Sequence, residues 1–392
     1  MVKALYITYM GLTEPLLYSQ ALNYLKSLSR QGIHFSILSF EKKEFLTEAN
    51  MAAIKTDLDD FGIKWIYLIY HKHFKLVTKP YDVIKGMLLS LYLSLRENLD
   101  VIHARGTMCA LMAIPAHSLL RKKVIFDMRG LMAEEYVDGN LWRRGSFFYK
   151  FVSKIENYFI KKYDEIIVLT DKIKKVFIYK YNISNISVIP TCVDLEKFDF
   201  KRPPDKINKG FTMIYTGSIG TWYMFAEMLD FYKIMHEIDH DAVFSILSQV
   251  DKKIIEKDIP LNVRKNIIIK SVKPLDVGSY LNNADVAISF IKPCFSKTAS
   301  SPTKFAEYLA CGLPVVINSG VGDIDQIVRK HRIGIVVDDF KKSDYRRAVD
   351  ELRKLLREGM VLKSRCRKVA EEYFSLESGS EKYLEVYKRL KR

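Results

Sequence analysis

Short apolar stretches alternate with longer segments of helical periodicity along most of the chain, and this alternation predicts parallel strands joined by crossover helices. A first series of expected strands comprises 4–9, 35–40, 65–70, 101–103, 124–128 and 165–169. A second series comprises 211–216, 242–247, 267–271, 286–290, 315–318 and 334–337. The pattern therefore predicts an α/β protein with two doubly wound sheets, and 392 residues exceed what one hydrophobic core usually supports.

A polar, proline-rich segment, Lys-Arg-Pro-Pro-Asp-Lys at 201–206, separates the two series. Such a composition is typical of a linker, so the first domain is expected over 1–200 and the second over 207–375. The last segment, 376–392, is expected to be helical. Ser378 and Glu381 have the spacing of a capping box there, and an apolar stripe follows at Tyr383, Val386, Tyr387 and Leu390.

Residues 300–317 predict a short helix followed by a buried strand. Ser301 is suited to the N-cap, Pro302 to the first helical position and Gly312 to the left-handed residue after the helix. The expected core face consists of Phe305, Tyr308 and Leu309.

The polar face of this helix is suited to a nucleotide. Its start offers free N–H groups and the positive end of the helix dipole, beside the side chains of Ser301, Thr303 and Lys304. Glu307 lies about 6 Å further along the axis, which is close to the offset between a nucleotide's diphosphate and its ribose. An amphipathic helix with one solvated glutamate is the alternative that this segment alone leaves open.

The segment resembles the nucleotide-sugar signature of the GT-B glycosyltransferases, most closely glycosyltransferase family 4, in which a glutamate before a Gly-x-Pro turn binds the donor ribose. Three further segments resemble that family in the required order: Asp-Val-Ile-His-Ala-Arg at 100–105, Val-Ile-Pro-Thr-Cys-Val-Asp-Leu-Glu-Lys-Phe at 188–198 and Asn-Ala-Asp-Val-Ala-Ile-Ser at 283–289. The resemblance implies the GT-B fold, in which two facing Rossmann-like domains enclose an interdomain cleft. The first domain would lie on the acceptor side, joined by the helix at 376–392, and the second would bind the donor.

The resemblance also implies an activity. A sugar would pass from a nucleotide-diphosphate donor to a hydroxyl of a glycan or lipid-linked glycan in surface polysaccharide synthesis, with retention of configuration and without a metal or other cofactor. The expected donor-binding residues are Gly11, Gly217, Ser218, Gly220, Thr221, Val272, Lys292, Ser300, Ser301, Thr303, Lys304 and Glu307. Val272 is included because the family's backbone meets the base there, and the glycines because they let backbone approach a phosphate.

Two residues are expected to act near the reacting sugar. His103 ends a strand at the expected cleft, and the resemblance implies that it contacts the donor sugar or phosphate. Arg129 follows the next strand and either meets the acceptor or a phosphate or pairs with Asp127. No group of carboxylates, histidines or cysteines has the spacing of a metal site, so none is expected.

The chain departs from the family pattern at two places. Ala299 stands where the family usually has a first glutamate near the sugar ring, and the usual Arg and Lys after the first strand of the donor domain are replaced by the segment 216–223. These departures keep two alternatives open. The chain could be a GT-B sugar-nucleotide epimerase, or a nucleotide-sugar-binding subunit without catalytic activity.

The formal net charge of +16 reflects either an anionic binding partner or another cause. Residues 121–162 contain ten Lys or Arg against five acidic residues, interleaved with aromatic side chains, and a second basic and apolar stretch covers 71–95. Contact with an anionic membrane surface and simple solvation of lysine-rich faces both remain open. No recognition motif for nucleic acid accompanies the charge, so nucleic acid is not an expected partner.

Cysteine usage and apolar runs bear on the compartment. The five cysteines are scattered and odd in number, and no cleavable signal segment follows Lys3. The longest apolar run, 87–95, is far shorter than the roughly 20 residues of a membrane-spanning helix. A cytoplasmic protein with reduced thiols is expected, held peripherally at the inner face of the membrane where membrane contact occurs.

Overall fold

The computed structural model describes residues 2–14, 17, 21–72, 75–199 and 210–391. These residues form two compact units, the first comprising Met1–Pro190 with Leu376–Arg392 and the second Thr191–Ser375. The expected linker at 201–206 lies outside the described residues. Both units are parallel α/β structures, so the predicted fold class is confirmed.

The sheet of the first unit has seven strands in the order β3-β2-β1-β4-β5-β6-β7. The strands are β1 (Val2–Thr8), β2 (Ile33–Glu41), β3 (Lys64–Ile69), β4 (Val101–Arg105), β5 (Lys123–Asp127), β6 (Glu165–Val168) and β7 (Ile186–Val188). All neighbours are parallel. The first six agree with the predicted strands to within a few residues, whereas β7 was not predicted, since three residues are too few to show a period.

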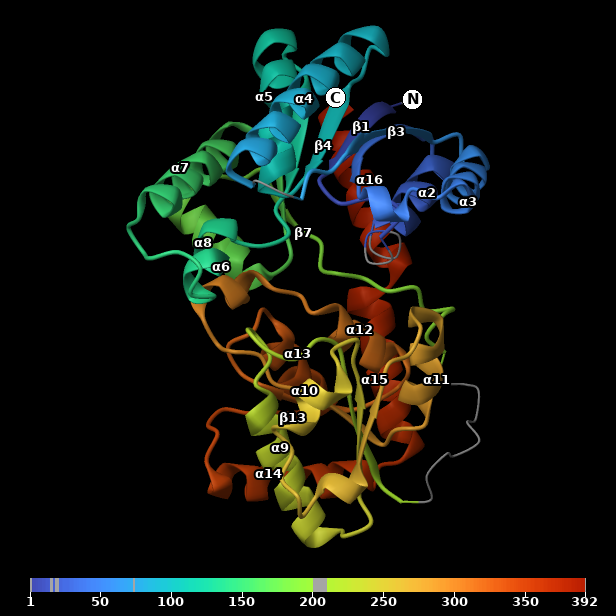
Figure 1. Cartoon of the computed structure of the whole chain (residues 1–392), viewed down its shortest axis with the longest axis vertical. Helices are drawn as coiled ribbons and strands as arrows, with labels where there is room; N and C mark the ends of the chain where they lie inside the picture. Colours follow the sequence, from blue (N-terminus) through green and yellow to red (C-terminus); the bar gives the residue numbers. More distant parts are fainter. Residues whose placement is uncertain (1, 15–16, 18–20, 73–74, 200–209, 392) are drawn as a thin grey trace. The chain divides into compact units, whose positions relative to one another are not determined.

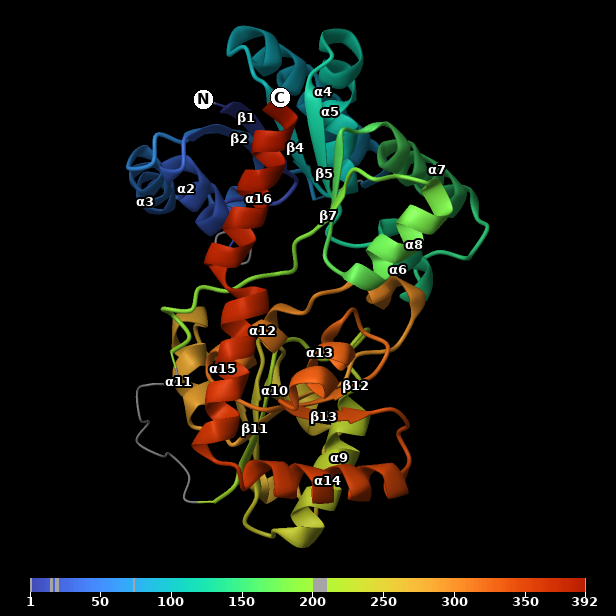
Figure 2. The same cartoon turned by 180° about the vertical axis from the view of Figure 1, so that it is seen from behind.

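Helices cover both faces of this sheet. They are α2 (Asn23–Arg30), α3 (Glu48–Asp59), α4 (Lys75–Arg96), α5 (Thr107–Leu120), α6 (Met132–Asp138), α7 (Phe147–Lys162), α8 (Asp171–Tyr181) and α16 (Leu376–Lys391). Figure 1 shows α4 and α5 in front of the sheet, and Figure 2 shows α16 in front on the opposite side.

The last helix, α16, buries Tyr383, Val386 and Tyr387 in the first unit, as the predicted apolar stripe requires. Its predicted range is confirmed at the start, but the predicted capping box at Ser378 and Glu381 was wrong. The helix begins at Leu376, directly after Ser375, so Ser378 lies inside the first turn rather than at a cap. The tight connection to the preceding helix decides the start, and local capping chemistry does not.

The sheet of the second unit has six strands in the order β10-β9-β8-β11-β12-β13. They are β8 (Thr212–Thr216), β9 (Val243–Leu247), β10 (Ile267–Lys270), β11 (Val286–Ser289), β12 (Val315–Asn318) and β13 (Gly334–Val337). The helices are α9 (Phe225–Ile238), α10 (Lys252–Glu256), α11 (Val277–Asn282), α12 (Thr303–Ala310), α13 (Ile324–His331), α14 (Lys342–Leu356) and α15 (Met360–Phe374), and a 3-10 turn, η5 (Phe295–Ala299), precedes α12.

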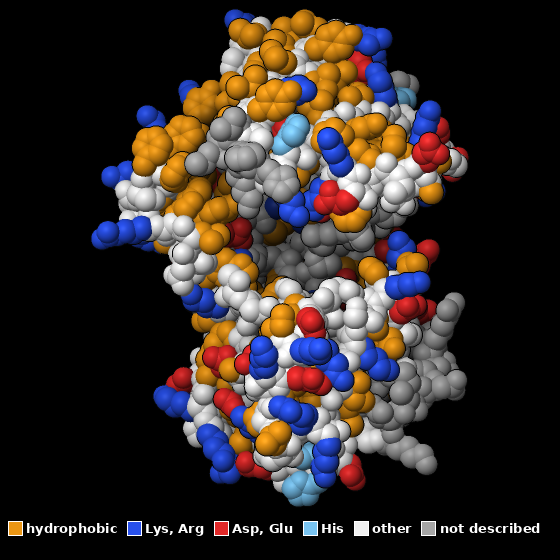
Figure 3. Space-filling view, viewed as in Figure 1, with side chains coloured by type: hydrophobic (Ala, Val, Ile, Leu, Met, Phe, Trp, Pro, Cys, Tyr) orange, Lys and Arg blue, Asp and Glu red, His pale blue; other side chains and the backbone are white. Residues whose placement is uncertain are grey.

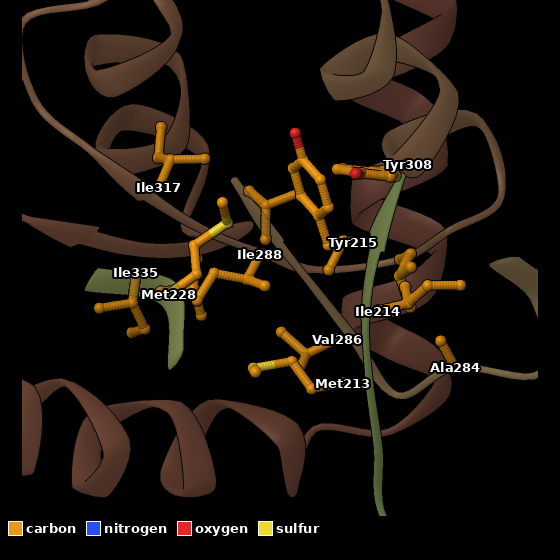
Figure 4. Packing of buried hydrophobic residues seen from close by; sticks show 14 of the residues in the cluster. Met213, Ile214, Tyr215, Met228, Ala284, Val286, Ile288, Tyr308, Ile317 and Ile335 are labelled. Atoms are coloured by element: carbon orange, nitrogen blue, oxygen red, sulfur yellow. The ribbon is translucent and has the colours of Figure 1, made fainter. Parts of the chain in front are cut away.

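The core of the second unit is continuous across the sheet. Every residue of β8 and β11 is buried, as expected for central parallel strands that helices cover on both faces. Figure 4 shows Met213 and Tyr215 from β8, Val286 and Ile288 from β11 and Tyr308 from α12 packed within this core.

The segment 191–199 packs in the second unit, whereas the first domain was expected to continue to residue 200. The Val193 N–H donates to the Phe374 carbonyl at 2.9 Å. Arg367 donates to the carbonyls of Leu195 and Phe198 at 3.3 and 2.6 Å. These bonds tie the segment to α15, so the chain leaves the first unit at Pro190, before the proline-rich segment.

Within the described residues, no helix has the length and apolarity to cross a bilayer.

Candidate functional site

Strands β8 and β11 flank the point where the strand order of the second unit reverses. In open parallel sheets, ligands bind outside the carboxyl ends of the strands at this point. The loop after β8 contains residues 217–221, and the segment after β11 leads through η5 to α12. The predicted donor residues of the second unit gather on these two segments, with Val272 on the loop after β10.

Helix α12 starts one residue later than expected. Thr303 is its first residue, and Pro302 occupies the N-cap position with an extended backbone. Ser301 was predicted as the N-cap, and this was wrong, because its hydroxyl accepts the backbone N–H of Thr191 at 3.1 Å. That bond joins two of the family-like segments, 188–198 and 300–317. Ser300 directly follows the last residue of the η5 turn, Ala299.

Lys304 is buried in the first turn of α12 and lies against aromatic rings. Its Nζ donates to the hydroxyl of Tyr215 at 3.0 Å, and it lies 4.2 and 3.7 Å from the ring centroids of Tyr215 and Tyr223. Burial lowers the pKa of Lys304 to about 7, although Glu307 opposes this shift. Near neutral pH the side chain therefore has a protonation state that an added anion can change.

Glu307 lies one turn further along α12 and is half-buried. Burial raises the pKa of Glu307 to about 7, and the charge of Lys304 opposes this shift. Its neighbour Tyr308 holds the helix against β8, since its hydroxyl accepts the N–H of Thr216 at 3.0 Å and lies 3.0 Å from the Thr216 hydroxyl. An acid and a base with pKa values shifted toward each other thus sit on one anchored helix, which is typical of a functional site.

The glycine loop after β8 differs from the expectation in one respect. Gly217 and Gly220 have positive φ values of 128° and 108°, while Ser218, Gly220 and Thr221 are exposed. A Cβ atom at Gly217 would lie 2.6 Å from the Nζ of Lys304. This glycine was expected to admit a phosphate. In the structure it admits the ammonium of Lys304, and the exposed part of the loop begins at Ser218.

Other predicted donor residues lie around this loop. Lys292 is half-buried, and its N–H donates to the Trp222 carbonyl at 2.8 Å. Lys297 is buried, with its Nζ 3.9 Å from the ring centroid of Trp222. The second unit therefore places two lysines of the η5–α12 segment against aromatic rings beside the same loop.

Val272 follows β10, and its carbonyl accepts the side-chain amide of Gln249 at 2.8 Å. The Gln249 carbonyl oxygen in turn accepts the hydroxyl of Ser271 at 2.8 Å. Sequence reasoning missed Gln249, because nothing in its local pattern distinguishes it from other exposed polar residues after a strand. It also missed Tyr215 and Tyr223, whose contact with Lys304 depends on the packing of α12 over β8.

In the first unit the loop after β1 is occupied by the protein's own carboxylates. The Gly11 N–H donates to Glu14 at 3.2 Å, and the N–H groups of Leu12 and Thr13 donate to Glu41 at 2.7 and 3.2 Å. Glu41 is fully buried, and a Cβ at Gly11 would lie 2.3 Å from its Oε2. Gly11 also makes room for Glu41, and its expected role in letting backbone approach the donor's phosphates stays a prediction.

His103 was expected to end a strand, but β4 continues to Arg105 and His103 is its middle residue. His103 and Arg129 belong to a network around Asp127, the last residue of β5. Four side chains approach this carboxylate: Tyr383 at 3.1 Å, His103 at 3.4 Å, and Arg105 and Arg129 at 3.7 Å. Burial alone would raise the pKa of Asp127, but Arg129 and His103 outweigh it and hold that pKa well below its usual range. The ion pair with Asp127 is one of the two roles considered for Arg129.

His103 is only 2% exposed, and both ring nitrogens have partners. Nδ1 lies 2.7 Å from the Tyr387 hydroxyl and Nε2 lies next to Asp127. Burial lowers the pKa of His103, and Asp127 opposes this shift. A neutral ring can donate from Nε2 to Asp127 and accept from Tyr387 at Nδ1. In this arrangement His103 joins α16 to the sheet, and contact with a sugar would require it to exchange one of these bonds.

No group of three His, Cys, Asp or Glu side chains that could hold a metal ion occurs among the described residues.

Comparisons with known proteins agree with this architecture. Residues 19–197 match the sequence model of Glycosyltransferase Family 4, and residues 296–369 match that of the Glucosyltransferase 3-like C-terminal domain. No curated protein matches the chain in sequence.

Solved structures with the same fold cover the whole chain. Sucrose-phosphate synthase from Thermosynechococcus elongatus superposes with a TM-score of 0.72 at 13% identity, covering 100% of this chain and 99% of its own. A glycosyltransferase from Rickettsia africae gives 0.72 at 16% identity, covering 100% and 99%. Anabaena HepE in complex with UDP-glucose gives 0.69 at 12% identity, covering 100% of both chains. The protein is a glycosyltransferase with the GT-B fold, and residues 19–197 carry the sequence pattern of Glycosyltransferase Family 4.

Proposed function

We propose that this glycosyltransferase takes a sugar from a nucleoside-diphosphate donor, a UDP-sugar, and attaches it to a hydroxyl of a glycan or lipid-linked glycan. The observation that carries the proposal is the placement of Lys304 and Glu307 on α12, beside the exposed loop Ser218–Thr221. HepE, which shares the fold, binds UDP-glucose, and this supports the choice of donor.

In the proposed complex the donor diphosphate lies at the start of α12. Backbone N–H groups of the first turn and the hydroxyls of Ser218, Thr221 and Thr303 donate to its oxygens. The negative charge favours the protonated form of Lys304, so binding raises the pKa of this lysine from about 7. Glu307, one turn further along, accepts from the ribose hydroxyls as a carboxylate.

Charge stabilisation is the main chemical contribution of this arrangement. When the bond between the sugar and the diphosphate breaks, negative charge grows on the departing diphosphate, and the Lys304 ammonium and the α12 N–H groups stabilise it. The proposed transfer retains the anomeric configuration and uses no metal ion. Transfer that persists in EDTA, with a product of the same anomeric configuration by NMR, would support both points.

His103 and Arg129 lie in the first unit. Their contacts with Asp127 link β4 to the end of β5. Direct contact of His103 with the donor sugar, which the family resemblance implies, stays a prediction.

Replacement of Glu307 by Gln tests the donor site. The change keeps the shape and removes a charged acceptor, so UDP-glucose affinity should fall about ten- to a hundredfold, equivalent to 1.5–3 kcal/mol. Calorimetric titration measures the affinity, and the melting temperature should change little. The matched control is Glu351→Gln, on an exposed position of α14. Equal affinities for wild type and Glu307→Gln would show that the donor does not bind at α12.

The pH dependence of the same titration sharpens the test. Glu307 must be ionised and Lys304 protonated for binding, and both have a pKa of about 7 in the free protein. UDP-glucose does not titrate in this range, because its diphosphate is doubly esterified. Affinity should therefore pass through a maximum near pH 7. Glu307→Gln should flatten the acidic side of this profile and leave the basic side in place.

Two alternative functions can be distinguished from glycosyl transfer by experiment. A sugar-nucleotide epimerase would convert the donor without any acceptor, so an altered free sugar after incubation with UDP-glucose alone would favour it. A non-catalytic subunit would bind the donor and show no turnover. Ala299, buried where the family usually has a glutamate, motivates this alternative, and transfer that Glu307→Gln abolishes would exclude it.

A further inference from the structure

Helix α4 of the first unit presents a continuous apolar stripe to solvent. The stripe consists of Tyr81, Ile84, Leu88, Tyr92 and Leu95, all of them exposed. Their spacing of three or four residues places them on one side of the helix, over a length of about 21 Å. Leu88 alone is 64% exposed. A row of this kind on a protein surface requires an explanation that scattered exposed leucines do not.

The opposite side of α4 already has its packing partner. Val83, Ser90 and Leu93 are buried, and α4 approaches α5 so closely that a Cβ at Gly86 would lie 2.4 Å from the Sδ of Met112. The hydrophobic core therefore uses one face of the helix. The exposed stripe is a second apolar face that this core does not use.

Cations flank the stripe. Lys85 lies with its Nζ 4.7 Å from the ring centroid of Tyr81, and the guanidinium of Arg96 lies 5.8 Å from that of Tyr92. The one acidic residue of the α4 sequence is Asp82, which is 1% exposed and accepts the hydroxyl of Tyr9. The solvent face of α4 is consequently apolar and cationic, without a carboxylate.

Helix α7 repeats this composition. Its exposed residues are Phe147, Phe148, Lys150, Phe151, Lys154, Tyr158, Lys161 and Lys162. The one acidic residue in its sequence, Glu156, is buried and accepts the hydroxyl of Thr107 and the N–H groups of Met132 and Ala133. Figure 3 shows the hydrophobic side chains of the first unit gathered over α4 and α7 on one face, with blue side chains at their margins.

The second unit has no comparable surface among its described residues. Its exposed large hydrophobic residues are spread over several elements, with Met360 and Val361 adjacent at the start of α15: Ile238, Ile254, Leu261, Leu275, Phe295, Met360 and Val361. Its surface helix α14 carries both signs of charge and makes ion pairs, such as Arg347 with Asp344 and Lys342 with Glu237. The apolar and cationic composition is thus specific to the first unit.

We propose that the exposed side chains of α4 and α7, here called the α4–α7 face, dock on an anionic phospholipid bilayer. Aromatic and aliphatic side chains enter the headgroup zone, and the lysines and arginines meet the lipid phosphates. Both helices lie along the bilayer surface. A second copy of the chain fits this face poorly, because two such faces would bring cations against cations.

Vesicle flotation tests the proposal with the whole chain. The protein is mixed with phosphatidylcholine vesicles that contain or lack phosphatidylglycerol. We expect binding to the anionic vesicles and release as the salt concentration rises. Leu88→Glu and Phe151→Glu should each weaken this binding about tenfold or more, since each replaces an inserted apolar group with an anion. Lys154→Glu should weaken it about fivefold or more.

The matched control is Leu261→Glu in the second unit, where the leucine is 80% exposed. This variant should bind like the wild type, and all variants should keep the wild-type melting temperature. Equal vesicle binding by wild type, Leu88→Glu and Phe151→Glu would overturn the proposal. So would equal binding to vesicles with and without phosphatidylglycerol, or a wild-type dimer that Leu88→Glu dissociates. UDP-glucose titration of the same variants tests the donor site independently of the membrane proposal. Their donor affinities should equal that of the wild type, because the substitutions lie outside the donor site.

Discussion

The first strand of each unit, β1 and β8, borders the point where the strand order reverses, and each is followed by a glycine-containing loop. In the first unit the N–H groups of this loop bind Glu14 and the buried Glu41. In the second unit the corresponding loop is largely exposed, and the ammonium of Lys304 lies against its first glycine. The same topological position is thus filled by carboxylates in one unit and bordered by a cation in the other.

The difference shows why topology alone does not locate an anion site. A loop whose N–H groups already bind a carboxylate has little left for a phosphate, and a resident carboxylate repels one. A lysine held against tyrosine rings is partly desolvated and is stabilised when an anion arrives. The second unit is therefore suited to the diphosphate, and the polar network of the first unit is suited to holding its own strands and α16 together.

The largest expected effect comes from breaking the network of the first unit. Asp127→Asn removes the charge that compensates Arg105 and Arg129, so the free energy of unfolding of this unit should fall by about 3–5 kcal/mol. Hydrogen exchange should show faster opening of β5 and α16 and unchanged protection in the second unit. Asp338→Asn, at an exposed ion pair of the second unit, is the matched control and should change little. Unchanged protection in Asp127→Asn would contradict the structural role.

The same carboxylate predicts a pH dependence. The folded-state pKa of Asp127 lies below its usual value of 3.8, so its stabilising contribution is complete above that pH and is lost as the pH falls toward the folded-state pKa. As the pH falls, β5 of the wild-type protein should therefore lose hydrogen-exchange protection. In the Asp127→Asn variant, β5 should lose little further protection over the same pH range. Parallel acid titrations of wild type and variant by hydrogen exchange measure this.

A second, smaller effect concerns the cation of the second unit. Lys304→Met keeps much of the side-chain volume and removes the charge, so UDP-glucose affinity should fall about ten- to a hundredfold. The melting temperature should rise, because the folded-state pKa of Lys304 is lowered to about 7 and the buried ammonium disfavours folding. This gain should be complete below pH 7 and should disappear as the pH rises toward 10.5. Lys342→Met, at an exposed position of α14, is the control for both measurements. A lower melting temperature with unchanged affinity would make Lys304 structural.

The smallest effect separates the two glycines of the donor loop. Alanine at either position strains a backbone with positive φ by about 1 kcal/mol, so the two variants should lose similar stability. Only at Gly217 would the new Cβ contact Lys304, whereas the space at Gly220 is open. Gly217→Ala should therefore weaken UDP-glucose binding several-fold more than Gly220→Ala does. Equal losses of affinity would show that the contact between Gly217 and Lys304 does not affect donor binding.

Strands and the core of α12 were predictable because their signal is local. The predicted strands 315–318 and 334–337 match β12 and β13, and Phe305, Tyr308 and Leu309 are buried as expected. Gly312 has a φ of 67°, as its predicted role after the helix requires. The helix caps were less predictable. Ser301 and Ser378 both have the residue type of a cap, yet Ser301 instead accepts a bond from Thr191, far away in the sequence, and Ser378 lies inside α16.

The sequence by itself determined two α/β units, the order of their strands along the chain and the helix that carries Lys304 and Glu307, because hydrophobic period, turn residues and motif spacing act over a few residues. Only the tertiary structure decided which loop holds its own carboxylate, where His103 finds its partners and how Lys304 comes to lie on two tyrosine rings. These contacts join residues such as Gly11 with Glu41 and His103 with Tyr387. Their energies depend on burial and on the distance between charges, and the packing of distant segments sets both.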